Sequence, residues 1–140
     1  MKTEQIILTT SIKAAVDLSA KKNLFIGFTG ALCAANEKAL GVLAENVLLD
    51  EQAPVAVSGI AIVKSGATFS IGAALASNAA GKAIAATTFS AVNADGAVAV
   101  TSSAATPPIT LAGSVLPQAI NGYALDEATA ADQLVRVKLV

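Results

Sequence analysis

Residues 55–64, VAVSGIAIVK, carry the strongest strand signal in the chain. Valine and isoleucine dominate both sides of Ser58 and Gly59, and β-branched residues favour strands. Because a glycine inside a strand pattern often marks a bulge, we expect the ladder to be interrupted at Ser58 and Gly59. The stretch therefore predicts a β protein whose strongest strand is broken at its centre.

Shorter apolar runs surround this strand, and turn residues separate them about every 8 to 12 positions, which is typical of a sandwich or barrel. They are Ile6–Leu8, Ile12–Val16, Leu24–Phe28, Ala31–Ala35, Leu40–Leu43, Val47–Leu49, Thr68–Ile71 and Leu134–Val140. In the last run, Val135, Val137 and Leu139 alternate with Arg136 and Lys138, so we expect one apolar and one polar face. The alternation predicts an all-β chain.

Turn and helix signals complete this prediction. Gly81 lies where a positive φ is tolerated, and Asp95-Gly96 suits a type I′ hairpin between Phe89–Asn93 and Ala97–Thr101. We expect Ala73–Ala80 to form strand and turn despite its alanines. The one expected helix is short: Asp126–Gln133 forms one or two turns with Asp126 as its N-cap.

A faint internal echo links two parts of the chain. Residues 39–43, ALGVL, lead through an acidic loop to Val55 and Val57, and residues 121–125, NGYAL, lead through a similar loop to Val135 and Val137. The similarity is either chance in a chain rich in alanine and valine or the trace of two related strand-loop-strand units. The sequence leaves both interpretations open.

Composition excludes several functional classes. The 140 residues are 54% hydrophobic but only 4% aromatic, with no histidine, a single cysteine and a net charge of −1. One domain fits this length. No run suits a membrane span or a signal peptide, and basic residues are too scattered for nucleic-acid binding. We expect a thin core, a buried Cys33, and apolar surface that another subunit covers.

Catalytic and ligand-binding patterns are equally scarce. Without histidine, neither a Ser-His pair nor an ordinary general base is present, and the glycines fit no phosphate-binding motif. The adjacent carboxylates Asp50 with Glu51, and Asp126 with Glu127, fit solvated turns. We therefore predict no enzyme, no cofactor and no metal site.

The chain resembles a known family in the order of five segments: AAVDLSAKKNLFIGF at residues 14–28, ALGVLAEN at 39–46, VAVSGIAIVKSGATFSIGAAL at 55–75, SNAAGKAIAA at 77–86 and NGYALDEATAADQLVRVKLV at 121–140. Together they are similar to the small phage capsid decoration or cement proteins of the DUF2190 type. The stretch from Ala85 to Leu116 departs from the shorter family pattern.

The resemblance implies a fold, a location and partners. The fold is a small β-barrel or β-tulip-like sandwich with an extended N-terminal arm over residues 1–13 and a single barrel-like domain over residues 14–140. The implied protein lies on the outer surface of a phage capsid, binds the major capsid protein and forms a trimer. An arm of this kind reaches onto the capsid lattice; the candidate contact residues are Lys2, Thr3, Glu4, Gln5, Ile6, Ile7, Leu8, Thr9 and Thr10.

Two other functions remain as alternatives. One is a surface-binding or carbohydrate-binding β module of a virion fibre, although five aromatic residues, one Tyr and four Phe, offer few platforms for sugars. The other is a small enzyme that uses serine or carboxylates such as Asp50 and Asp126. The leading prediction is a structural virion protein that stabilises a phage head.

Overall fold

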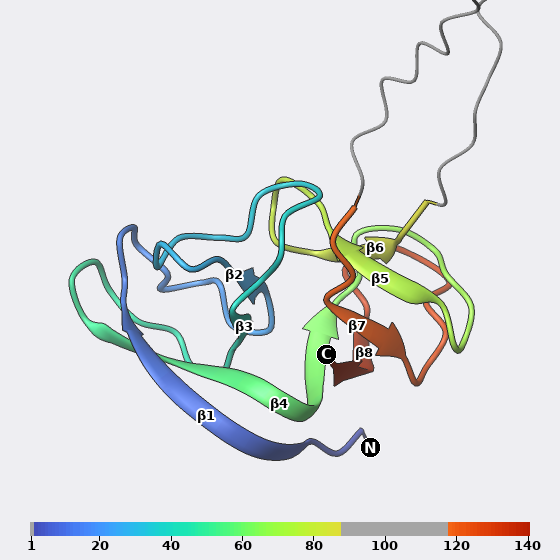
Figure 1. The fold of residues 1–140 in the computed structure, drawn as a ribbon, viewed down its shortest axis with the longest axis horizontal. Helices are drawn as coiled ribbons and strands as arrows, with labels where there is room; N and C mark the ends of the chain where they lie inside the picture. The colour runs from blue at the N-terminus through green and yellow to red at the C-terminus, as the bar shows by residue number, and fades with distance from the viewer. Residues whose placement is uncertain (1, 88–117) are drawn as a thin grey trace, which may run out of the picture. The chain divides into compact units, whose positions relative to one another are not determined.

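The computed structural model describes residues 2–87 and 118–140. All strands belong to one compact unit, Met1–Ala86 with Gln118–Val140. In chain order they are β1 (Gln5–Lys13), β2 (Phe25–Ile26), β3 (Gly41–Leu43), β4 (Gln52–Lys64), β5 (Ala74–Ser77), β6 (Ala83–Ala85), β7 (Gly122–Ala124) and β8 (Leu134–Leu139) (Figure 1). The described residues contain no helix, so none of them forms one that could cross a membrane. The all-β prediction is confirmed, and the expected hairpin at Asp95-Gly96 lies outside the described residues.

The strands form one nearly closed sheet. Its order is β2-β3-β4-β8-β7-β5-β6, and β1 pairs separately with β4. Every strand pair is antiparallel. A parallel bridge between Ser65 and Ala83 brings β6 back to the end of β4, which makes this part of the sheet a small barrel. The barrel-like fold predicted from the sequence is therefore present.

The expected interruption of β4 lies at Gly59, whose φ is 107°. Opposite it, Ile6 pairs with Gly59 and Leu8 with Ser58, so Ile7 has no partner residue on β4. A second shift leaves Val57 without a partner on β1. A Cβ atom at Gly59 would meet the carbonyl oxygen of Gln5, which explains why this position needs glycine. Bulges of this kind bend a strand. The two halves of β4 accordingly pair with different strands: the first half pairs with β3 and the second half with β8.

The internal echo corresponds to a structural repeat. In the first repeat, residues 9–57, β3 pairs with the first half of β4, and in the second, residues 60–86 with 118–139, β7 pairs with β8. The backbone hydrogen bonds match as well: Leu18 N donates to Val47 O at 3.0 Å and Phe69 N to Ala128 O at 3.0 Å. Both segments of the echo therefore form strand-loop-strand units with equivalent pairings.

The equivalence extends through both repeats. Ala14 N donates to Glu51 O, and Ser65 N donates to Gln133 O, each at 2.8 Å. Equivalent core residues, first repeat before second, are Ile12 and Val63, Leu18 and Phe69, Ile26 and Leu75, Leu43 and Ala124, Val47 and Ala128, Ala53 and Val135, and Val55 and Val137. The bend at Gly59 thus lets β4 end one repeat and begin the next.

Two apolar clusters fill the compact unit, one within the first repeat and one shared by both repeats. The smaller contains Leu18, Ile26, Leu43, Ala53 and Val55 of the first repeat, with Ala14 beside them. The larger holds the second-repeat core together with a few residues of the first repeat. Alanine and valine make up much of both, as expected for a core with few aromatic side chains.

Two local predictions were wrong. Residues 126–133 form turns instead of a helix, because Phe69 and Ala128 exchange both backbone hydrogen bonds at 3.0 and 2.9 Å, and the Asp126 carboxylate accepts the Arg136 amide at 3.0 Å. The runs at 31–35, 47–49 and 68–71 contribute single bridges at Leu32, Val47 and Phe69, not strands. In both cases long-range backbone pairing replaced the local preference.

Candidate interaction surface

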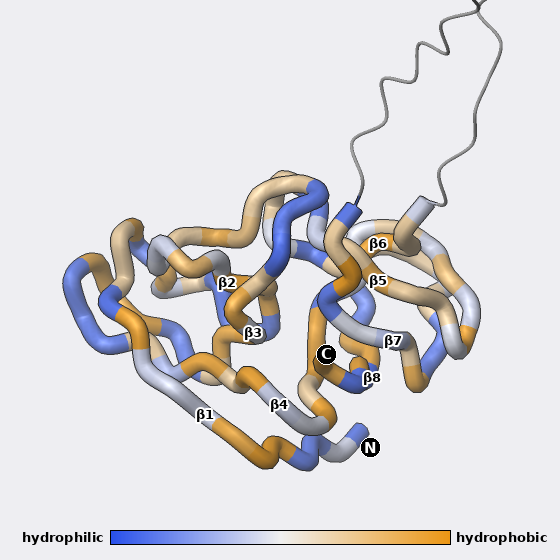
Figure 2. Tube along the Cα trace, in the orientation of Figure 1, coloured by the Kyte–Doolittle hydropathy of each residue, from blue (hydrophilic) through white to orange (hydrophobic). Residues whose placement is uncertain are grey.

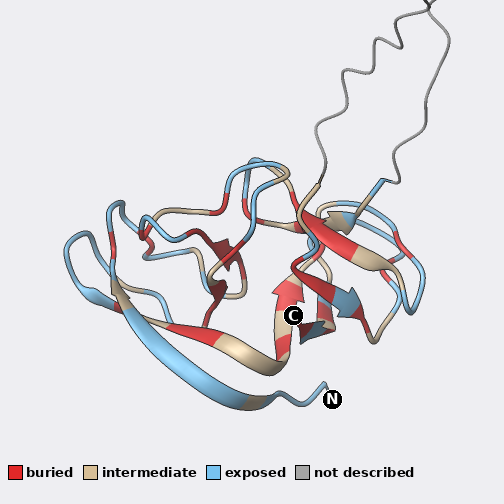
Figure 3. Ribbon diagram, in the orientation of Figure 1, coloured by how far each residue is buried: buried red, intermediate tan, exposed pale blue. Residues whose placement is uncertain are grey.

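The N-terminal strand β1 is the most exposed element of the fold. Seven of its nine residues are exposed, and only Ile6 and Ile12 are partly buried (Figure 3). Ile7 is 77% exposed and Leu8 58% exposed, and Figure 2 shows an apolar stretch at this point of the strand. Burying such side chains stabilises a protein by about 1.5–3 kcal/mol each. Covering these exposed side chains of β1 with another chain would therefore contribute favourable binding free energy.

The outer edge of β1 is also open. Among the described residues β1 pairs only with β4, so the backbone groups on its other edge have no strand partner. Natural edge strands are usually protected by charges, proline or short length. Residues 5–12, QIILTTSI, contain no charge and no proline. This edge is suited to pairing with a strand from another chain.

The residues before β1 lie against the body of the protein. Lys2 Nζ donates to Leu134 O at 2.6 Å, and Glu4 Oε1 accepts the Ile62 amide at 3.1 Å. The nine candidate contact residues, Lys2 to Thr10, thus comprise a docked segment and the first six residues of β1. Ile6 packs against the larger core cluster, and the others are exposed. Their contact with a capsid stays a prediction.

A groove of about 290 Å³ lies beside the bulge in β1. Its walls come from β1, from the bend in β4 and from the β7–β8 side of the sheet, with the lining residues Gln5, Ile7, Ser58, Gly59, Ile60, Leu125, Lys138 and Leu139. The sequence indicated the bend at Gly59 but not the approach of Leu125 and Lys138. Only the pairing of β4 with β8 brings these side chains together.

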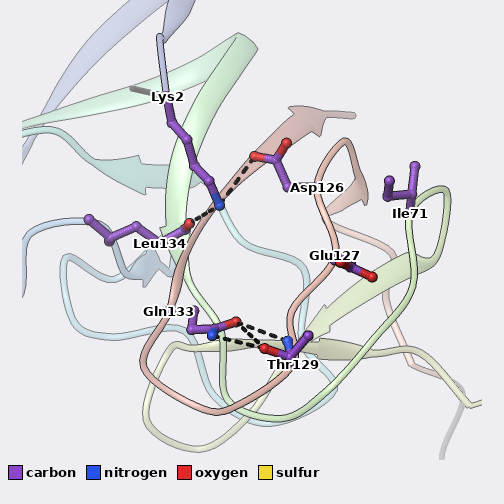
Figure 4. Close-up of a pocket in the computed structure, with 7 residues that line it drawn as sticks. All are labelled: Lys2, Ile71, Asp126, Glu127, Thr129, Gln133 and Leu134. Atoms are coloured by element: carbon purple, nitrogen blue, oxygen red, sulfur yellow. Dashed lines mark hydrogen bonds and ion pairs between the residues drawn. The ribbon is translucent and has the colours of Figure 1, made fainter.

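A second, wider groove of about 610 Å³ lies where Lys2 meets the loop after β7 (Figure 4). Asp126 is its central charge: its carboxylate accepts hydrogen bonds from Arg136 Nε at 3.1 Å and Nη2 at 2.8 Å, and Lys2 Nζ lies 3.5 Å away. The Asp126 side chain is only 17% exposed. The interpretation of Asp126 as a solvated turn charge was therefore wrong, because Arg136 on β8 lies beside it.

These contacts lower the pKa of Asp126 well below its usual range. The hydrogen bonds from the Arg136 side chain are the main cause, and the Arg136 amide and Lys2 add to them against an opposing effect of burial. The hydrogen bonds to Asp126 and its negative charge in turn raise the pKa of the Arg136 guanidinium. Asp126 is therefore fully ionised at neutral pH and ties β8 to the loop after β7.

We predict that Asp126→Asn lowers the free energy of unfolding by about 1–2 kcal/mol at pH 7, as for a hydrogen bond to a charged group. Because the folded-state pKa is depressed, the carboxylate stabilises the protein above its unfolded pKa of about 3.9, and this contribution is lost as the pH falls towards the folded value. Urea unfolding of both proteins at pH 7 and at acidic pH measures the difference. A gap that stays constant with pH would contradict the assignment.

Other reactive groups are few in the described part of the chain. Cys33 is fully buried, as predicted, and burial raises the pKa of its thiol, which keeps the thiol protonated. Among the described residues, no three carboxylate or cysteine side chains gather as metal ligands would. Asp50 forms an ion pair with Lys13 at 2.7 Å, and Glu51 accepts the Leu48 amide.

Together these features define a small β-barrel protein with an exposed strand suited to binding another chain. A similar solved structure is the head fiber gp8.5 N base in bacteriophage phi29, which matches with a TM-score of 0.57 and 15% identity over 95% of each chain. At this identity the likeness establishes a shared fold. No family model and no curated protein matches the chain.

Proposed function

We propose that the chain is a structural protein of a phage virion that binds the outer surface of the head and stabilises the lattice of its major capsid protein. The proposal rests on the exposure of strand β1. This strand combines an open edge, exposed Ile7 and Leu8, and no charge from Gln5 to Ile12. An extended segment of capsid protein would pair with this edge and cover both side chains.

The fold supports a phage context for this proposal. The similar structure is named as the base of a head fibre, so this fold occurs in a component of a phage head. The resemblance of the five sequence segments to capsid decoration proteins points the same way. The proposed role needs binding surface and no chemistry, which agrees with a histidine-free chain.

A second candidate is the base of a head fibre. The name of the similar structure favours it, since the match covers 95% of both chains. Such a base would also bind the head, but it would hold a fibre in place without strengthening the lattice. Heat release of DNA from heads with and without the protein separates the two roles: a cement protein raises the release temperature, and a fibre base leaves it unchanged.

We expect the double variant Ile7→Ser with Leu8→Ser to weaken binding to purified heads by about 30-fold or more, the effect of losing an apolar anchor at an interface. Co-sedimentation with heads measures binding. Because both side chains are exposed, the free energy of unfolding should change by less than about 0.5 kcal/mol for each substitution.

Phe28→Ser is the matched control. Phe28 is 65% exposed and lines neither groove, so its loss should leave binding to heads unchanged. Equal binding by the wild type, the double variant and the control would show that β1 is not the contact strand. Absence of the protein from purified virions would overturn the proposal as a whole.

A further inference from the structure

The repeat gives each half of the fold an equivalent row of side chains across its strands. In the first repeat the row is Phe25, Val42 and Ala56, which pair across β2, β3 and β4. In the second repeat it is Ala74, Tyr123 and Lys138, which pair across β5, β7 and β8. Both rows lie on the side of their strands opposite the core of their own repeat.

The two rows differ in how they are covered. Phe25, Val42 and Ala56 are at most 2% exposed and belong to the same buried cluster as the second-repeat core. The first row is thus covered by the second repeat. In contrast, Tyr123 is 41% exposed, Lys138 is exposed and Ala74 is partly exposed. Among the described residues, no packed layer buries this second row in the way that the second repeat buries the first row.

A complementary gap exists on the first repeat. Ile12, Leu40 and Val47 at the margin of its core are only partly buried. Their second-repeat equivalents, Val63, Asn121 and Ala128, are at most 3% exposed. Leu40 is equivalent to Asn121 because the Leu40 amide donates to Ile26 O and the Asn121 amide donates to Leu75 O. Ile26 and Leu75 are themselves equivalent residues of the two repeats.

Asn121 shows how that margin is closed in the second repeat. Its side chain accepts the Ala39 amide at 2.8 Å and donates to Glu37 O at 3.1 Å, so it binds the first repeat directly. The first repeat therefore binds the margin of the second at Asn121, and Val63 and Ala128 belong to the same buried cluster as Phe25, Val42 and Ala56. In the described residues, Ile12, Leu40 and Val47 pack against the cluster of the first repeat alone.

We infer that the row Ala74, Tyr123 and Lys138 binds the open core margin at Ile12, Leu40 and Val47 of a second copy of this chain. The contact between the two repeats of one chain serves as the template, because there the row of the first repeat and the margin of the second belong to one buried cluster. The row and the margin are different patches, so the contact is head-to-tail and closes into a ring when the rotation between copies allows it. Tyr123 and Lys138 are more polar than Val42 and Ala56, as expected for a contact between separate subunits.

Sedimentation velocity on the full chain, over a range of micromolar concentrations, tests this contact without capsids. We expect the wild type to self-associate, and Tyr123→Glu combined with Lys138→Glu to raise the dissociation constant about 30-fold or more. Both residues are exposed, so the variant should fold, which circular dichroism checks. Ile71→Ser is the control and should associate as the wild type does. A monomeric wild type, or a variant that associates normally, would overturn the inference.

A photo-crosslinker at position 123 maps the partner surface. Tyr123 is replaced by p-benzoylphenylalanine, and the protein is mixed with heavy-isotope-labelled copies so that products between chains are recognised by mass. Attachment near Ile12, Leu40 or Val47 of the other copy supports the head-to-tail contact. Attachment to the other copy's own β7, or within the same chain only, contradicts it. These outcomes do not depend on capsid binding, so they leave the proposed function to its own test.

Discussion

Gly41→Ala is expected to lower the free energy of unfolding by about 3 kcal/mol or more, the upper end for an overpacked site. A Cβ atom at Gly41 would overlap the Ala56 carbonyl oxygen, which is backbone and cannot turn away. To make room, β3 would have to separate from β4, although these strands join the β2–β3 edge to the rest of the sheet. Since domains are stable by only about 5–15 kcal/mol, the variant should be close to unfolding at moderate temperature.

Gly27→Ala is the matched control. Its added Cβ would lie 3.7 Å from Cys33 Cα, which is ordinary contact. The loss of backbone freedom in the unfolded chain should then leave stability unchanged or raise it by up to about 1 kcal/mol. Urea unfolding followed by circular dichroism compares the two variants. If Gly41→Ala were as stable as the wild type, β3 would not approach β4 as closely as the structure shows.

Phe25→Ala is expected to cost about 3–5 kcal/mol, as for other buried phenylalanines. The side chain is fully buried in the cluster that joins the two repeats, and its amide donates to Gly81 O at 2.7 Å. Its loss leaves a cavity between the repeats, so both should become less stable together. A fall in the urea midpoint at an unchanged denaturant slope would indicate this shared loss.

Phe28→Ala provides the comparison, because Phe28 lies three residues away but is 65% exposed. Its removal should change stability by less than about 0.5 kcal/mol. If the two phenylalanine variants were equally stable, the junction between the repeats would not depend on Phe25.

The two proposed contacts use different residues, although they meet at two places: Ile12 of the open margin belongs to β1, and Lys138 lines the same groove as Ile7. Capsid binding is assigned to the open edge and apolar side chains of β1, whereas the contact between copies uses β5, β7 and β8 and the margin of the first repeat. Variants at Ile7 with Leu8 and at Tyr123 with Lys138 separate the two contacts experimentally.

Much of the fold could be predicted from local patterns. The β-branched runs on both sides of Gly59 indicated strand, and the alternation from Val135 to Leu139 gave the correct faces, because side chains alternate sides along a strand. Gly81 has the expected positive φ of 71°. A chain without histidine also lacks the side chain that most often serves as a general base near neutral pH. Short-range rules suffice for such features because they depend only on residue type and on neighbouring residues.

The candidate surfaces depended on contacts between distant residues. The family resemblance implied an N-terminal arm, but its pairing with β4, its open edge and the unpaired Ile7 follow from the register between residues 5–13 and 52–60. Likewise, the echo hinted at two units, yet the sequence could not show that Phe25 is covered and Tyr123 exposed. Local sequence determined which segments are strands and which chemistry is scarce. Only the tertiary structure decided which strand edges and faces stay open, because coverage depends on what packs against a residue from elsewhere in the chain.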